Sequence, residues 1–200
     1  MAELGPEIVA DVVAACEAGA SEAGEALGRA LDATSLELSV GEAGTFDPAA
    51  LGEGYDAAGL AVMLKIGEVG ADFLIPETSG LLPDWYAAPD PTGESKLTTL
   101  AQELSMVLLP ETFLCEEFKA AKVSHLGEAL TRSEIAAGAP LVPLELKSED
   151  KSAAAMLVWP MAKPEELFEA SAAEEESEAP AEEAPAAEEP VAAVPSLAPA

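Results

Sequence analysis

The pattern of hydrophobic positions predicts two amphipathic helices. Apolar residues recur every three or four positions from residue 6 to about residue 31, and Pro6 is compatible with a first helical turn. The same spacing returns at residues 95–109, where the apolar stripe is wide enough to predict a helix that is buried on most sides. Glu103 lies in the middle of this second helix. The pattern leaves open whether its carboxylate is a solvent-facing charge or a site residue.

Small residues in the first predicted helix indicate a close contact with a neighbouring element. Gly19, Gly24 and Gly28 all fall within it. Each glycine weakens a helix by roughly 1 kcal/mol relative to alanine, so a structural reason for keeping them is expected. Because glycine has no side chain, another backbone can approach closely at these positions. We therefore expect a close helix crossing along this stretch.

Strand-like segments follow the first helix and close the domain. Alternating or continuous apolar runs predict strands at residues 35–40, 60–66, 71–75, 141–146 and 153–159. Gly67 and Gly70 indicate a hairpin turn between the second and third of these strands. Residues 111–121 are predicted to form a short helix, whereas residues 122–130 are ambiguous and could form a strand followed by a helix. The order of elements predicts an α+β domain with helices on one face of a mainly antiparallel sheet.

The composition changes abruptly after Lys163. Residues 164–200 contain 11 glutamates, 12 alanines and 6 prolines, with no lysine or arginine. Such a segment has too little apolar surface to offset the entropy of ordering, and its prolines favour extended conformations. The sequence therefore predicts a folded domain at residues 1–163, followed by a disordered acidic linker or tail at residues 164–200.

Charge and composition exclude several classes of function. The chain has 38 acidic and 9 basic residues and a net charge of -29, so nucleic acid and anionic membranes are excluded as partners. No apolar run approaches the roughly 20 residues of a transmembrane helix, and the N-terminus lacks the pattern of a signal peptide. Cys16, Cys115 and the single His125 are too few for a zinc site or a Cys–His nucleophile. We expect a cytoplasmic protein without a cofactor.

The segment at residues 76–91 contains two further groups of candidate residues. Trp85 and Tyr86 lie together among prolines, so they are candidates for contact with a partner, with anchoring of the loop as the alternative. Glu77, Asp84 and Asp90, with Glu94 just beyond the segment, offer carboxylates that calcium could use. They lack the spacing and the central glycine of an EF-hand loop, so we expect no metal here.

Several motifs resemble one known family. The segment CEAGASEAGEALGRALDATSLELSV at residues 16–40 is similar to the first helix and strand of the CheC, CheX and FliM-type flagellar switch and chemotaxis domains, whose motif is EIxNIGAGxAAxAL. Residues 59–82 resemble the hairpin of that family, and residues 99–113 fall where its Glu-x-x-Asn helix is repeated. The resemblance covers nearly all of residues 8–160. It implies a CheC-like pseudo-twofold arrangement of helices packed on a mainly antiparallel sheet.

The resemblance also implies where catalytic residues would lie. In the phosphatases of this family, asparagine orients an attacking water and the glutamate three positions earlier binds a lysine of the phosphorylated response regulator. The matching positions here are Ala14 and Glu17 in the first helix, and Glu103 and Met106 in the second. Neither pair is intact, and the chain contains no asparagine at all. The residues that would position a nucleophile on a phosphoryl group are therefore missing.

From these observations we predict a non-catalytic protein-binding module of the flagellar motor switch or chemotaxis type, and not an enzyme. Its expected partners are motor ring subunits or a CheY-like regulator, and its expected location is the cytoplasm, at the flagellar basal body. Candidate partner-binding residues are Trp85, Tyr86, Gln102 and Glu103. The alternative is a divergent CheC- or CheX-like phosphatase that uses Glu17, Gln102 and Glu103 instead of the usual amide.

Overall fold

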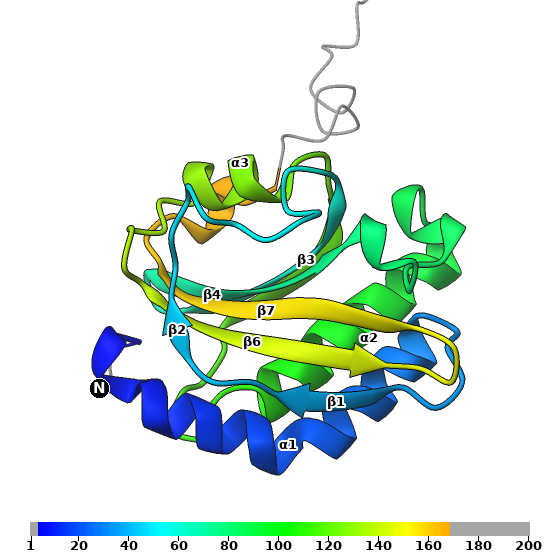
Figure 1. Ribbon diagram of the computed structural model, residues 1–200, viewed down its shortest axis with the longest axis horizontal. Helices are drawn as coiled ribbons and strands as arrows, with labels where there is room; N and C mark the ends of the chain where they lie inside the picture. The colour runs from blue at the N-terminus through cyan, green and yellow to red at the C-terminus, as the bar shows by residue number, and fades with distance from the viewer. Residues whose placement is uncertain (1–3, 169–200) are drawn as a thin grey trace, which may run out of the picture. The chain divides into compact units, whose positions relative to one another are not determined.

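The computed structural model describes residues 4–168 and contains helices on both faces of one sheet (Figure 1). Its helices are α1 (Val9–Ala30), α2 (Pro91–Val107) and α3 (Leu126–Arg132). Its strands are β1 (Glu37–Val40), β2 (Gly44–Thr45), β3 (Gly59–Ile66), β4 (Val69–Pro76), β5 (Glu117–Val123), β6 (Pro140–Lys147) and β7 (Ser152–Met161). No helix in this described part of the chain is long and apolar enough to cross a membrane.

The order of the strands shows an internal pseudo-twofold repeat. Among the described residues the sheet runs β1-β6-β7-β4-β3-β5, with β2 paired to β6, and all these pairs are antiparallel. Exchanging β1 with β5, β6 with β3 and β7 with β4 maps this order onto itself in reverse. The two halves are therefore α1-β1-β3-β4 and α2-β5-β6-β7. The predicted α+β fold with a mainly antiparallel sheet and two related helices is confirmed.

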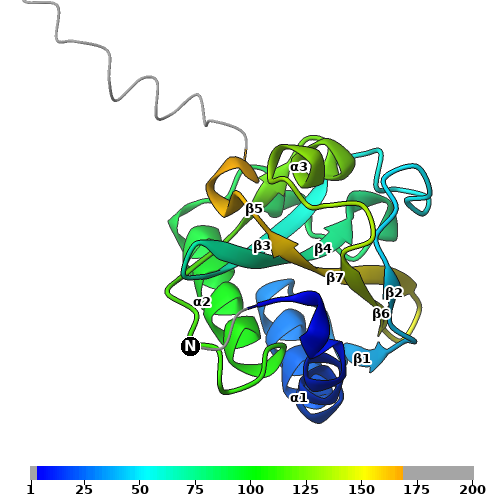
Figure 2. The same cartoon turned by 90° about the vertical axis from the view of Figure 1, so that its left-hand side faces the viewer.

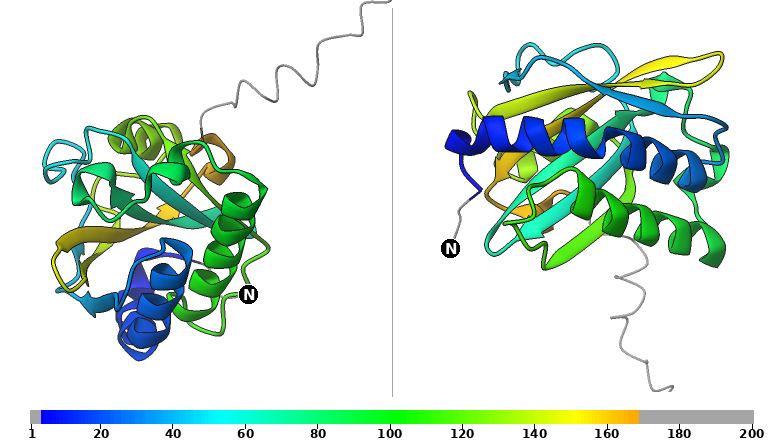
Figure 3. Two further views of the ribbon diagram at one scale, coloured as in Figure 1. Left: turned by 90° about the vertical axis from the view of Figure 1, so that its right-hand side faces the viewer. Right: turned by 90° about the horizontal axis from the view of Figure 1, so that it is seen from below.

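The sheet is covered on both faces. Side chains alternate along β3, so that Leu60, Val62 and Leu64 lie in the core beneath α1 and α2, whereas Ala61 and Met63 lie in a second core. Figures 2 and 3 show α1 and α2 side by side on one face, and Figure 2 shows α3 on the other. The expectation of helices on one face therefore holds for the two long helices, and α3 departs from it.

The short helix predicted at residues 111–121 is wrong, because residues 111–116 form turns and irregular structure and residues 117–121 belong to β5. Along β5, the side chains of Phe118 and Ala120 turn toward the core and alternate with exposed charged residues. β5 pairs with β3, from Val123 opposite Gly59 to Glu117 opposite Lys65. Alternation with charges is the pattern of an edge strand with one wet face. The second predicted helix also starts earlier than residue 95, because the Asp90 carboxylate accepts a hydrogen bond from the Gly93 N–H at 2.7 Å and caps the first turn of α2.

The packed part of the chain continues past the predicted boundary at Lys163. Leu167 is fully buried in the second core, and Glu165 forms an ion pair with Lys65 of β3. Pro164 packs over Gly70 of β4, where an added Cβ atom would lie 3.2 Å from the Cβ atom of Pro164. The folded domain therefore extends to Phe168. The rest of the predicted linker, residues 169–200, lies outside the described residues.

Candidate functional site

The two long helices cross where the glycines of α1 predicted a close contact. A Cβ atom added to Gly19 would lie 2.4 Å from the carbonyl oxygen of Val107, and the Cys16 thiol donates to the carbonyl oxygen of Leu108 at 3.4 Å. Gly24 serves a different contact, because a Cβ atom there would lie 2.5 Å from the carbonyl oxygen of Leu36. Burial, assisted by Glu17, raises the pKa of Cys16 to about 12, so this cysteine is a packing residue and not a nucleophile.

The degenerate family positions on α1 lie beside this crossing. Ala14 and Glu17 are both exposed, and they are separated by one turn on the outer side of the helix. A methyl group stands where the resemblance requires a carboxylate that binds lysine. A carboxylate stands where it requires an amide, so the first pair offers no group that could both donate to and accept from a water molecule.

The second pair lies on α2. Glu103 is partly exposed and accepts a hydrogen bond from Nη2 of Arg29 at 2.8 Å, which makes a surface ion pair. Its role as a site residue stays a prediction. Met106, one turn further on, is 71% exposed. Gln102 is exposed next to Glu103. Glu103 and Arg29 also line a groove of about 480 Å³ between the C-terminal half of α1 and the N-terminal half of α2.

Trp85 and Tyr86 anchor the loop that leads into α2. The indole Nε1 of Trp85 donates to Asp32 at 2.9 Å, and Lys96 lies 5.3 Å from its ring centroid. Lys96 and Trp85 together hold the pKa of Asp32 below its usual value. Tyr86 is 3% exposed and its hydroxyl donates to Glu77 at 2.5 Å. Anchoring thus accounts for both rings, and a partner contact stays a prediction for Trp85, whose ring is half-buried.

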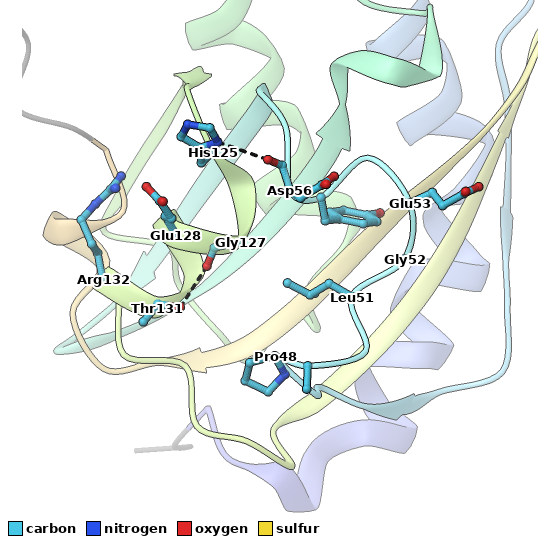
Figure 4. Close-up of a pocket in the computed structure, with 12 residues that line it drawn as sticks. Pro48, Leu51, Gly52, Glu53, Asp56, His125, Gly127, Glu128, Thr131 and Arg132 are labelled. Carbon is cyan, nitrogen blue, oxygen red and sulfur yellow. Dashed lines mark hydrogen bonds between the residues drawn. The ribbon is translucent and has the colours of Figure 1, made fainter.

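Two further features were not anticipated from the sequence. The first is a groove of about 850 Å³ on the opposite face of the sheet, between the loop that precedes β3 and helix α3 (Figure 4). The only hint of it in the sequence is the stretch of glycine, proline and alanine at residues 41–55, together with His125. The histidine precedes α3, and its Nδ1 lies 3.1 Å from the carbonyl oxygen of Asp56.

The second feature is a buried carboxyl group in β4. Asp72 is fully buried, and neither of its side-chain oxygens has a hydrogen-bond partner among residues 4–168. Its neighbours across the sheet are Met63 and Val158, both in the second core. Burial raises the pKa of Asp72 well above its usual value, and the nearby backbone of Val62, which is not placed for a full hydrogen bond, offsets only part of this rise in pKa. The group lies apart from the family positions on α1 and α2, and no metal-binding group of three or more His, Cys, Asp or Glu side chains occurs in residues 4–168.

Comparison with known proteins identifies the fold. No model of a known protein family matches the chain, and no curated protein sequence matches it. Among solved structures, Thermotoga maritima FliY is similar with a TM-score of 0.52 and 10% identity, covering 83% of this chain and 96% of FliY. FliM in a FliM–SpeE complex from H. pylori gives a TM-score of 0.52 at 12% identity and covers 82% of this chain and 94% of that one.

A CheC-like superfamily protein from Shewanella sp. PV-4 matches with a TM-score of 0.37 and 13% identity, over 70% of this chain and 93% of that one. FliY and FliM, at TM-scores of 0.52, have the same fold as this chain, so the resemblance to FliM-type domains is confirmed at the level of the fold. At these identities the comparison describes architecture, and function has to be argued from the residues of this chain.

Proposed function

We propose that the protein is a non-catalytic binding module of the flagellar motor switch or chemotaxis type. The observation that carries the proposal is the state of the second family site. Glu103 is held by Arg29 on the neighbouring helix, and the side chain one turn further on is the exposed thioether of Met106. A thioether is a weak acceptor with no N–H to donate, so it does not orient a water molecule for attack on phosphorus.

The first family site supports the same proposal for a different chemical reason. Glu17 places a negative charge where an in-line nucleophile would approach an anionic phosphoryl group, and Ala14 has no group to bind a lysine. The chain has no asparagine that a shift of register could bring into either position. Both halves of the pseudo-twofold repeat therefore lack the asparagine of the family motif while they keep the helix crossing that supports the surface.

This same surface has the features of a binding site. Met106, on α2, is a large apolar side chain that is 71% exposed. Exposed apolar side chains among polar neighbours are typical of protein contacts, and the exposed Gln102, one turn before Met106 on α2, is such a polar neighbour. One of the similar structures is a complex of FliM with SpeE, so a domain of this fold forms a protein complex in that case. The proposed partners are motor ring subunits or a CheY-like regulator, in the cytoplasm at the base of the flagellum.

Calorimetric titration of the full chain with purified motor ring subunits and a CheY-like regulator from the same genome tests the proposal. We expect at least one of these proteins to bind, and Met106→Asp to weaken that binding about tenfold by placing a charge in the interface. Ala154→Asp, at an exposed position of β7 on the opposite face of the sheet, is the matched control and should bind like the parent chain. Absence of binding to every one of these proteins contradicts the proposal.

A divergent phosphatase is the second candidate, and one observation favours it. Gln102 is the only carboxamide side chain in the sequence, and it is exposed next to Glu103. An amide at this position could in principle orient water in place of asparagine. This candidate requires that the chain accelerate release of phosphate from a phosphorylated response regulator, and that replacing Gln102 and Glu103 with alanine abolish the acceleration.

A further inference from the structure

The groove on the α3 face is a fixed feature of the fold and not an accident of a loose loop. The Gly127 N–H donates to the carbonyl oxygen of Tyr55 at 2.7 Å, and the Leu126 N–H donates to that of Ala57 at 3.0 Å. These backbone hydrogen bonds fasten the end of the loop to the first turn of α3. The space between the loop and the helix encloses about 850 Å³.

The floor of this groove is apolar. Tyr55 is 4% exposed and belongs to the second core, and Leu51 packs half-buried against the same core. A Cβ atom added to Gly127 would lie 3.2 Å from Cδ1 of Leu51, so the missing side chain lets the loop lie close to the helix. Figure 4 shows Leu51 and Pro48 on one side of the groove, and Thr131 of α3 on the other. Such a floor favours aliphatic groups.

The rim of the groove is acidic. Glu53 and Asp56 from the loop and Glu128 from α3 line it with exposed side chains (Figure 4). Arg132 also lines it, but its guanidinium group donates to the carbonyl oxygens of Glu166 at 3.2 Å and Leu167 at 3.0 Å, where it holds the end of the domain. The surface charge that a ligand meets is therefore mainly negative, in a chain whose net charge is -29.

We propose that this groove binds a short segment of a partner protein that presents aliphatic side chains flanked by lysine or arginine. The apolar floor accounts for the aliphatic groups, and the three carboxylates account for the basic flanks. Since most of the lining side chains are exposed, the site is an open channel that suits an extended segment better than an enclosed small molecule. The groove lies on the face of the sheet opposite α1 and α2, so this inference stands apart from the proposed function, and both faces can be occupied at once.

Selection of random short peptides by phage display on the full chain tests the inference. We expect the enriched peptides to share aliphatic residues next to lysine or arginine, and their affinity to fall with added salt. A synthetic copy of an enriched peptide should bind about tenfold more weakly to Leu51→Asp, which charges the floor, and to Glu128→Lys, which reverses a charge on the rim. Glu128 is exposed, so the second variant tests the groove without disturbing the core.

Matched controls separate the groove from the rest of the acidic surface. Leu114→Asp and Glu149→Lys make the same chemical changes at exposed positions outside the groove, and both should bind the peptide like the parent chain. Three results would overturn the inference: no enrichment above that seen with the Leu51→Asp protein, enriched peptides without basic residues, or equal loss of affinity in Glu128→Lys and Glu149→Lys. Circular dichroism of each variant establishes that the protein compared is folded.

Discussion

Arg29 and Glu103, separated by 74 positions in sequence, are joined by a hydrogen bond of 2.8 Å between Nη2 and Oε1. The contact ties the last turn of α1 to the middle of α2, the two helices that the pseudo-twofold repeat relates. It also engages Glu103, the one glutamate that still stands at the glutamate position of the family's Glu-x-x-Asn motif. A lysine of a partner that binds Glu103 would therefore compete with Arg29 for this carboxylate.

The Arg29–Glu103 pair should contribute little to stability. Its side chains are 65% and 36% exposed, so solvent screens the attraction and ordering two long side chains offsets part of it. A double-mutant cycle with Arg29→Ala and Glu103→Gln should give a coupling energy of about 0.2–1 kcal/mol that decreases with salt. A coupling energy of several kcal/mol would mean that the pair is a main determinant of the helix crossing.

Gly19→Ala should destabilise the protein, although alanine favours a helix. The added Cβ atom would lie 2.4 Å from the Val107 carbonyl oxygen, so α1 and α2 must separate, at a cost of about 1–3 kcal/mol in the free energy of unfolding. Gly44→Ala is the control, because no atom lies within 4 Å of a Cβ atom built at that position. Urea unfolding of both variants measures the difference, and equal stability would show that the crossing is looser than described.

Leu167→Ala should show that the domain does not end at Lys163. Leu167 is fully buried, and truncation of a buried leucine to alanine costs about 2–5 kcal/mol. Leu114→Ala removes the same atoms from a side chain that is 81% exposed, and its stability should stay within about 0.5 kcal/mol of the parent. If the two variants unfold at the same urea concentration, the segment after Lys163 does not stabilise the domain.

Asp72 should make the protein less stable as the pH rises. Burial raises its pKa in the folded chain above 3.8, so at higher pH the unfolded chain releases this proton first and unfolding becomes more favourable. Between 3.8 and the folded pKa, Asp72 therefore lowers stability by at most about 1.4 kcal/mol per pH unit. Above the folded pKa its effect is constant.

Asp72→Asn removes this titration. Its stability relative to the parent chain should increase as the pH rises from about 4 to about 8 in urea unfolding experiments. The exposed Asp150→Asn is the control and should follow the parent at each pH. If the free energies of unfolding of the parent chain and Asp72→Asn changed with pH in parallel, the conclusion that Asp72 is protonated in the folded state would be contradicted.

The parts of the fold that sequence predicts best are those with strong local signals. The helical spacing of α1 and its glycines predict a packing surface without knowledge of which element packs on it. The β3–β4 turn was predicted from its glycines, and Gly67 indeed adopts the left-handed region with a φ of 62°. β5 was missed because its alternating run is short and its apolar residues Phe118 and Ala120 stand among charges. The hydrophobic pattern of an edge strand is weak, and β5 is recognised as a strand only by its pairing with β3.

The second face of the sheet could not be predicted, because it is built from segments that are far apart in sequence. In the sequence, Asp72 resembles a solvent-facing polar position in a strand with one buried face. In the structure, the second core, which includes residues of α3 and Leu167, lies on that face. The groove beside α3 depends in the same way on backbone hydrogen bonds between residues 55–57 and residues 126–127, which leave no periodic signal. The degenerate pairs on α1 and α2 were located by resemblance, whereas the Arg29–Glu103 contact was visible only in three dimensions.

The most direct test of the account is the rate of phosphate release from a phosphorylated CheY-like response regulator that binds the full chain. We expect the parent chain to leave this rate at the value of the regulator alone, because Met106 has no N–H to hold the attacking water and the negative charge of Glu17 repels the anionic phosphoryl group. Met106→Asn, which supplies the missing amide beside Glu103, is the informative companion variant. A parent chain that accelerates the release, and that loses this effect in the Gln102→Ala and Glu103→Ala double variant, would contradict the non-catalytic account.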